Sequence, residues 1–447
     1  MHRTALAALA LAALLPQAQA SQPWPIYSTS PQHEDYSDLK PFADAIGNAR
    51  IVALGEQTHG GREEYLLKTR LLKFLHEKMG FDVMLLESGF YDMARLAERV
   101  ERGEKLDDIA PGSVFFMYAN TAEGRGMLQY VDRQRALGKP MALGGIDSQH
   151  TGETSKKELL PRLQAYLKIA APALAEGEAW RRYAQTAQPL LEMQRTPPPA
   201  EAQAAFRQHA AALRAALCQP ASPAGGAASP GTRAGTDSGA DTDTGAVAAA
   251  GAGAGAAAGM FASAAFWCQA VKSVDAQAAS YWSADHDYQR DNQMGDNAIW
   301  LADQLYPGRK VVIWAHTVHT ARGFQRTPVN LQAGEVMHRH WGADYKIVQF
   351  SGAGGKILDF VTNRPLALPA LPPDSLEASL ARQPHALLGL TASALPQLQQ
   401  SQQPQQKQPQ PQPQFSYEYQ LQRGGQLGVN WDVLFFIRQI TPVSMAR

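Results

Sequence analysis

The feature that most constrains the fold is a series of short apolar runs, separated by longer segments of helical character. Each run is continuous rather than alternating and is bounded by glycine or polar residues, which is typical of strands buried on both faces of a parallel sheet. The runs cover residues 50–54, 83–86, 141–143, 311–314, 345–350 and 433–437. They predict an α/β fold with a mostly parallel sheet.

The segment between the first two runs predicts the first helix. Apolar side chains recur near helical spacing over residues 62–79, and Gly80 follows in the position of a C-terminal cap. The resulting strand–helix–strand unit, roughly 35 residues long, is expected to cross over right-handedly within one sheet.

Two stretches rich in Ala and Leu interrupt the strand pattern. Residues 156–217 and 262–305 favour helix, and we interpret them as a helical lobe inserted between sheet strands over residues 155–285. The lobe divides the α/β core into a first part, residues 21–154, and a second part, residues 286–447.

Two low-complexity segments look like insertions, because patterned sequence resumes after each. Residues 219–259 are dominated by small residues and bury too little apolar surface to offset chain entropy, so we expect them to be disordered. Residues 396–414 predict an extended Gln/Pro-rich linker. Cys218 and Cys268 bracket the first insertion. In an oxidising compartment a disulfide would close its base, and two separate buried thiols are the alternative.

The first 20 residues have the organisation of a secretory signal. A basic start at Arg3 precedes an Ala/Leu run over residues 4–15, and Ala18 and Ala20 place small residues before a cleavage site at Ser21. The run is shorter than the roughly 20 residues that a membrane-spanning helix needs. We therefore expect a secreted or periplasmic protein with no membrane span in the mature chain.

Charge and missing motifs argue against several classes of protein. The 41 Lys and Arg residues balance 41 Asp and Glu residues, whereas a nucleic-acid binder normally has a basic face. Two cysteines rule out a four-Cys zinc site. The sequence has no G-x-S-x-G nucleophile elbow and no phosphate-binding glycine loop. A nucleophilic serine of the usual hydrolase type and nucleotide binding are therefore not supported.

Acidic and histidine side chains follow four of the predicted strands. In chain order they are Glu56 with His59, then Glu87, then Asp147, and finally His316 with His319. The carboxyl ends of parallel strands meet at one edge of an open sheet, where ligands bind. Each residue alone has an ordinary explanation, such as a helix N-cap for Asp147. As a set they predict an active site.

The set suits attack of water on an ester. A neutral imidazole can remove a proton from water, and a neighbouring carboxylate can orient the ring and stabilise the imidazolium. A second histidine could polarise the carbonyl group or protonate the leaving group. Three imidazoles and two carboxylates would also suffice for zinc or manganese, so a metal-dependent hydrolase of ester or peptide bonds remains an alternative.

Two longer blocks resemble the erythromycin esterase family. The first, GEQTHGGREEYLLKTRLLKFLHEKMGFDVMLLE, has a G-E-x-x-H motif, a charged helix and a strand ending in Glu. The second, RDNQMGDNAIWLADQLYPGRKVVIWAHTVH, has an R-D-x-x-M helix and a strand ending in A-H-x-x-H. GGID and DVLFFIRQITPV are similar as well, so the resemblance covers residues 50–150 and 280–440. AHTVH differs from the family's commoner AHNAH at its inner positions.

This resemblance implies a three-layer α/β/α core with a helical lobe over the active cleft. It also implies hydrolysis of a macrolactone ester by water, without a covalent enzyme intermediate, and hence macrolide resistance. His59 would be the catalytic base, with Glu56 and Glu87 as its carboxylate partners. His316 and His319 would be the histidines that face them across the cleft, with His316 as a further catalytic residue.

The remaining candidates for substrate binding include His319 and Asp147. Lys68 and Arg70, on the first helix where family members carry Arg, are candidates as well, and each would contact a carboxylate or the substrate. The partner would be a small-molecule ester or macrolide, with no cofactor and no metal. A distant fold relationship to haem-binding and metalloprotease proteins leaves a non-catalytic haem- or polyketide-binding protein as a further alternative.

Overall fold

The computed structural model describes residues 22–218, 259–283, 289–324, 327, 329–373, 375–400 and 425–446. The segment interpreted as a secretory signal lies outside the described residues. So do nearly all of the low-complexity insertion and the Gln/Pro-rich linker from residue 401 onward.

An eight-stranded sheet forms the centre of the fold, in the order β1-β9-β10-β6-β2-β5-β3-β4. Its strands are β1 Trp24–Pro25, β2 Ile51–Glu56, β3 Phe81–Gly89, β4 Ala142–Asp147, β5 Lys310–His316, β6 Tyr345–Gly352, β9 Leu387–Thr391 and β10 Val433–Ile437. All pairs from β10 to β4 are parallel, and β9 and β1 add antiparallel strands at one edge. The predicted mostly parallel sheet is confirmed. Each predicted run overlaps one of its strands, although β2 and β4 begin one residue later than predicted.

The α-helices connect these strands. They are α1 Lys40–Ile46, α2 Arg62–Met79, α3 Phe90–Glu101, α4 Leu106–Ile109, α5 Phe116–Ala119, α6 Ala122–Ala136, α7 Glu153–Ala170, α8 Gly177–Leu191, α9 Ala200–Leu217, α11 Ala264–Trp282, α12 Gln289–Trp300, α13 Thr317–Thr320, α14 Ala333–Trp341, α15 Leu376–Ala381 and α16 Leu395–Gln400. The predicted first helix is α2, and Gly80 ends it in the left-handed conformation at φ 76°. Within the described part of the chain, no helix has both the length and the apolar character needed to cross a membrane.

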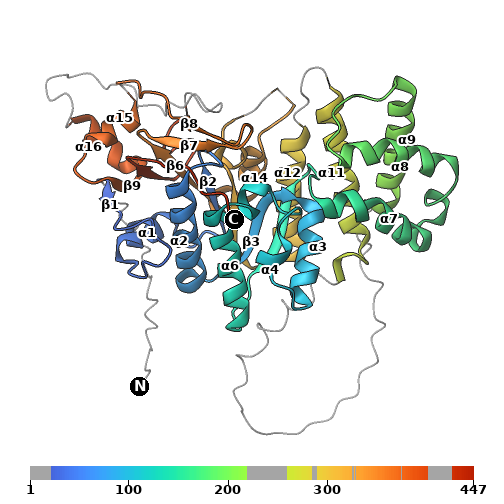
Figure 1. The fold of residues 1–447 in the computed structure, drawn as a ribbon, viewed down its shortest axis with the longest axis horizontal. Coiled ribbons are helices and arrows are strands. Elements are labelled where there is room, and N and C mark those ends of the chain that lie inside the picture. Colours follow the sequence, from blue (N-terminus) through green and yellow to red (C-terminus); the bar gives the residue numbers. More distant parts are fainter. Residues whose placement is uncertain are drawn as a thin grey trace, which may run out of the picture.

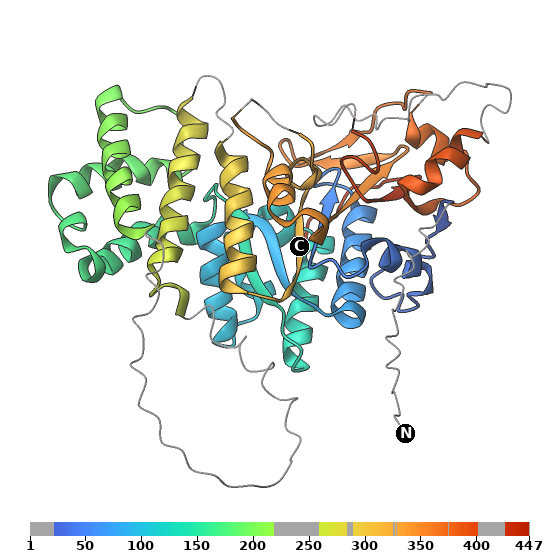
Figure 2. The same cartoon turned by 180° about the vertical axis from the view of Figure 1, so that it is seen from behind.

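Helices cover both faces of the sheet (Figures 1 and 2). The chain runs from β2 to β3 and β4 in one direction along the sheet and returns to β5 and β6 in the other. Because crossovers between parallel strands are right-handed, the two directions place their helices on opposite faces. Accordingly α2 packs with α6, and α12 packs with α14. The implied three-layer α/β/α architecture is confirmed.

Helices α7, α8, α9 and α11 form the helical lobe, which extends from the β4 side of the sheet (Figure 1). Helix α11 joins the lobe to the core by packing against α3 and α12. A disulfide links Cys218 at the end of α9 to Cys268 in α11, with their Cα atoms 5.1 Å apart. The two cysteines are therefore paired across the base of the insertion.

Three features of the fold differ from the sequence interpretation. The short strand β9 and the two-stranded hairpin of β7, Lys356–Asp359, and β8, Arg364–Ala367, were not predicted. Strand β8 is exposed along its whole length, so it lacks the apolar run by which buried strands are found. The Gln/Pro-rich linker begins after α16 rather than at residue 396, because Leu395 and Leu398 pack into the core at helical spacing.

Candidate active site

The four strands predicted to carry the site do end at one edge of the sheet. Glu56, Asp147 and His316 are the last residues of β2, β4 and β5. Glu87 lies inside β3 rather than after it, at a shift in the β3–β4 register between Leu86 and Gly89. Such an irregularity re-aims a side chain, and here it turns the carboxylate of Glu87 towards the end of β5, where it meets the backbone N–H of His316.

Glu56 and His59 form a dyad at the end of β2. His59 Nδ1 lies 3.0 Å from Glu56 Oε1, which also accepts a 2.9 Å hydrogen bond from the Tyr118 hydroxyl. The other oxygen, Oε2, forms an ion pair with Lys68 of α2, and both side chains are fully buried. An ionised carboxylate only accepts hydrogen bonds, so His59 carries its proton on Nδ1 and its lone pair on Nε2. Lys68 therefore supports the dyad from inside the protein, so of its two expected contacts, a carboxylate or the substrate, the structure shows the carboxylate.

Burial keeps the His59 imidazole neutral. Aromatic rings of Phe115 and Phe360 stand edge-on to it, with centroids 4.7 and 5.2 Å away. His59 is 6% exposed, and burial lowers its pKa to about 4, against the attraction of Glu87. At neutral pH the ring is therefore in the form that can accept a proton.

His316 is held by backbone groups on both sides of its ring. Nδ1 accepts a 3.0 Å hydrogen bond from the N–H of Val318 and so caps α13, while Nε2 lies 2.9 Å from the carbonyl oxygen of Gln57. Burial lowers the pKa of His316 well below its usual value. With both nitrogens engaged, this ring fixes the loop after β2 in the structure, and its expected catalytic role stays a prediction.

His319 is the charged imidazole of the site. Its Nδ1 lies 2.5 Å from Asp291 Oδ1, and its Nε2 lies 3.3 Å from Glu87 Oε1. These two carboxylates raise the pKa of His319 to about 9, against the effect of burial. Against the effect of burial, the positive charge and hydrogen bond of His319 hold the pKa of Glu87 well below its usual range. His319 is therefore protonated at neutral pH and offers an Nε2–H whose 3.3 Å contact with Glu87 is loose.

Arg290 adds a second positive charge that sequence reasoning missed. It binds Asp147 through two hydrogen bonds of 2.9 and 2.7 Å and approaches Glu87 Oε1 at 3.7 Å. Asp147 thus positions Arg290 at the edge of the site. Arg290 and Asp291 both belong to the R-D-x-x-M motif at the start of α12, and that motif was the signal from which their roles could have been found.

Comparison with known proteins bears on this arrangement. The erythromycin esterase family matches residues 76–440, which is most of the chain. The chain belongs to the erythromycin esterase family. It is 37% identical over 75 residues to the erythromycin esterase type II of Escherichia coli, covering 17% of this chain and 18% of that protein. It is 27% identical over 124 residues to the type I enzyme of Escherichia coli, covering 27% of this chain and 29% of that protein.

Solved structures support the fold of this family member. A mutant of the erythromycin esterase EreC in its open conformation superposes with a TM-score of 0.63, at 14% identity, over 94% of this chain and 97% of that chain. A likeness at this identity shows the fold. The curated relatives are matched over less than a third of their own length.

Arg70 lies apart from the candidate active site of this erythromycin esterase family member, and of its two expected contacts, a carboxylate or the substrate, the structure shows the carboxylate. The side chain is fully buried on α2, and all five of its N–H donors are used. They bond both carboxylate oxygens of Asp38 and the backbone carbonyls of Ser28, His33 and Asp35. Arg70 thus fastens the N-terminal segment to the core.

A metal ion has one candidate position among the described residues. Glu56, His59 and Glu87 each offer a ligand atom, and these atoms lie within 4.8 Å of one another. Glu56 is a poor ligand in this arrangement, because Lys68 occupies one of its oxygens while Tyr118 and His59 share the other. A cation bound by all three residues would have to displace the buried ammonium group. The side chains of Glu56, His59 and Glu87 are therefore better suited to a hydrogen-bonded dyad beside a second carboxylate than to binding a metal ion.

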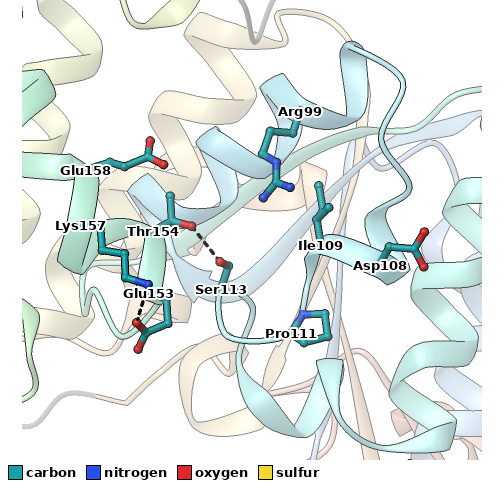
Figure 3. A pocket seen from close by; sticks show the side chains of 9 residues that line it. All are labelled: Arg99, Asp108, Ile109, Pro111, Ser113, Glu153, Thr154, Lys157 and Glu158. Atoms are coloured by element: carbon teal, nitrogen blue, oxygen red, sulfur yellow. Dashed lines mark hydrogen bonds and ion pairs between the residues drawn. The ribbon is translucent and has the colours of Figure 1, made fainter.

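A separate pocket of about 310 Å³ is lined by residues of α3, α4, α7 and the segment between α4 and α5 (Figure 3). Its polar lining includes Ser113, hydrogen-bonded to Thr154, and the ion pair of Lys157 with Glu153. The residues that line this pocket include none of those that form the dyad or its charged neighbours. It is therefore distinct from the site at the strand ends.

Proposed function

We propose that this protein is an exported hydrolase that opens a macrolide lactone or a related ester with water activated by His59. The observation that carries the proposal is the dyad of a neutral His59 with a buried Glu56, facing the carboxylate of Glu87. The names of its erythromycin esterase relatives supply the substrate class.

The first chemical step follows from the state of each group. A water molecule gives one proton to His59 Nε2, and its oxygen forms a bond with the carbonyl carbon of the ester. Glu56 accepts the hydrogen bond from the Nδ1–H of His59 and stabilises the imidazolium that forms. Glu87 can accept a hydrogen bond from the second O–H of the water and so orient the water molecule. His319 donates a hydrogen bond from its Nε2–H to the carbonyl oxygen and stabilises the negative charge that develops there.

The second step returns the proton. The tetrahedral intermediate collapses, the bond between the carbonyl carbon and the alcohol oxygen breaks, and His59 Nε2 gives its proton to that oxygen. The products are a carboxylic acid and an alcohol, which remain in one molecule when the substrate is a lactone. General-base assistance of this kind typically contributes about 10²–10⁴-fold to the rate.

Export and macrolide resistance are further parts of the proposal. The signal-like first 20 residues support export, and so does the Cys218–Cys268 disulfide, because such bonds persist in oxidising compartments. An enzyme placed there would meet an incoming macrolide before the drug reaches the cytoplasm.

The pH dependence of kcat/KM is expected to be bell-shaped. Activity should rise as His59 loses its proton near pH 4, and it should fall as His319 loses its proton near pH 9. Initial rates on a soluble ester between pH 3.5 and 10 measure both limbs, and the His319→Gln variant should lack the alkaline one. A single acid limb at the usual histidine pKa, about 6.5, would contradict the role of burial at His59.

Incubation with a panel of macrolides and simple esters, read by mass spectrometry, tests the function. The expected product of erythromycin is heavier by one molecule of water and forms at the same rate with and without EDTA. Loss of turnover on chelation, with stoichiometric metal in the purified protein, would favour the metal-dependent hydrolase that the cluster of Glu56, His59 and Glu87 also permits. Absence of turnover on the whole panel would reject the proposal.

A further inference from the structure

The β7–β8 hairpin is fastened to the loop that carries His59. The carbonyl oxygen of Gly60 accepts hydrogen bonds from the N–H of Leu358 in β7, at 3.1 Å, and from that of Val443, at 3.0 Å. A side chain at Gly60 would collide with the backbone of Leu358, since its Cβ would lie 1.8 Å from the carbonyl oxygen. Glycine is therefore required for this close approach, and the hairpin turn is placed beside His59.

The turn of this hairpin delivers Phe360 to the catalytic imidazole. Its ring stands at 85° to that of His59, with centroids 5.2 Å apart, and lies 6.3 Å from the ring of Phe115. The residues next to these two in the chain are apolar and exposed, since Val361 is 75% exposed and Phe116 is 38% exposed. The ring of Phe116 lies 5.1 Å from that of Phe115, so exposed apolar side chains adjoin this pair.

A charged network also lies close to His59. It consists of Glu87, His319 and Arg290 and is anchored by Asp147 and Asp291. A bound ester must place its carbonyl group near the donors of this network. Its carbon skeleton would need an apolar surface beside His59, and the rings of Phe115 and Phe360 provide one.

We infer that Phe360 and Phe115 form the substrate's apolar contact surface and select esters that carry a bulky aliphatic group next to the reacting carbonyl. The inference rests on the proposed function and assigns its substrate preference to two positions. A buried aromatic side chain contributes much of the apolar area in a binding site. Half-buried rings beside a reacting group gain further burial when an aliphatic skeleton covers them.

The test compares a bulky and a small ester. The Phe360→Ala variant is expected to lower the ratio of kcat/KM for erythromycin to kcat/KM for p-nitrophenyl acetate about 10-fold or more. Phe360→Leu, which keeps an apolar side chain, should restore most of that ratio. Leu366→Ala is the matched control, because Leu366 is an apolar, 41% exposed residue of the same hairpin on β8. Thermal unfolding of each variant checks that the hairpin change leaves the fold intact.

A ratio that stays at the wild-type value in Phe360→Ala would overturn the inference while leaving the hydrolase intact. Equilibrium binding of erythromycin to the His59→Asn variant, with and without Phe360→Ala, separates the two proposals. If Phe360→Ala weakens erythromycin binding but the wild-type protein hydrolyses no ester, the proposed hydrolysis is rejected and the apolar contact is supported. Binding that Phe360→Ala does not weaken, or no binding at all, would reject the contact.

Discussion

Replacing His59 by asparagine is expected to lower kcat/KM for ester hydrolysis by about 10²–10⁴-fold. The change removes the group that takes the proton from water, and asparagine has no basic nitrogen to replace it. Glu56 keeps its hydrogen bond from Tyr118 and its ion pair with Lys68 in this variant. Initial rates with a soluble ester, alongside circular dichroism of both proteins, give the comparison.

His385→Asn is the matched control for this change. His385 is exposed, in the segment just before β9, so the same substitution there should leave kcat/KM within about twofold of the wild type, as surface substitutions usually do. If the His59→Asn variant retained the wild-type rate, water activation by this ring would be wrong, and the mechanism would need another base.

Replacing Lys68 by methionine is expected to cost about 3–5 kcal/mol of unfolding free energy. The substitution leaves the carboxylate of Glu56 buried without its charged partner, and a buried unpaired charge is costly. Glu56 then tends to take up a proton, which weakens its acceptor role towards His59. We therefore expect a loss of activity as well, and Lys68→Arg, which keeps the positive charge, should recover both properties in part.

Arg70→Met is the control that separates the loss of stability from the loss of activity. Arg70 lies on the same helix and forms a buried ion pair with Asp38, so its removal should cost a similar 3–5 kcal/mol. Urea unfolding measures both losses, and kcat/KM is compared at a temperature where both variants remain folded. Only Lys68→Met should change the rate and the acid limb of the pH profile. Equal effects of the two substitutions on the rate would show that Lys68 acts through stability alone.

The position of the site could be predicted from the sequence because it depends on topology. Continuous apolar runs identify parallel strands, and the carboxyl ends of parallel strands share one edge. Glu56, Glu87, Asp147 and His316 were brought together by that argument, and the structure places them there.

The roles of the two histidines in AHTVH could not be predicted in this way. Both follow β5, and their chemistry is decided by hydrogen bonds that depend on the local backbone. His316 turns back to cap α13 and loses its free nitrogen, whereas His319 points to carboxylates from α12 and β3. Asp291, the partner that raises the pKa of His319, stands 28 residues earlier in the chain.

Residues that reach the site from irregular segments were equally hard to predict. Phe115 precedes a four-residue helix, and Phe360 lies in a hairpin turn. Neither position carries a periodic signal. On α2, the sequence left open whether Lys68 and Arg70 contact a carboxylate or the substrate, because charged residues in a helix with a buried face fit both. In the folded protein each meets a buried carboxylate, Glu56 or Asp38.

The placement of β10 has a consequence for how the active enzyme arises. This strand is the last of the sheet in sequence, yet it lies inside the sheet between β6 and β9, and the segment that follows it holds Gly60 through Val443. A chain in which β10 has not yet paired has neither the complete sheet nor the contact that fixes the loop carrying His59. The sheet and this loop are therefore completed together and late in folding, once β10 has inserted between β6 and β9.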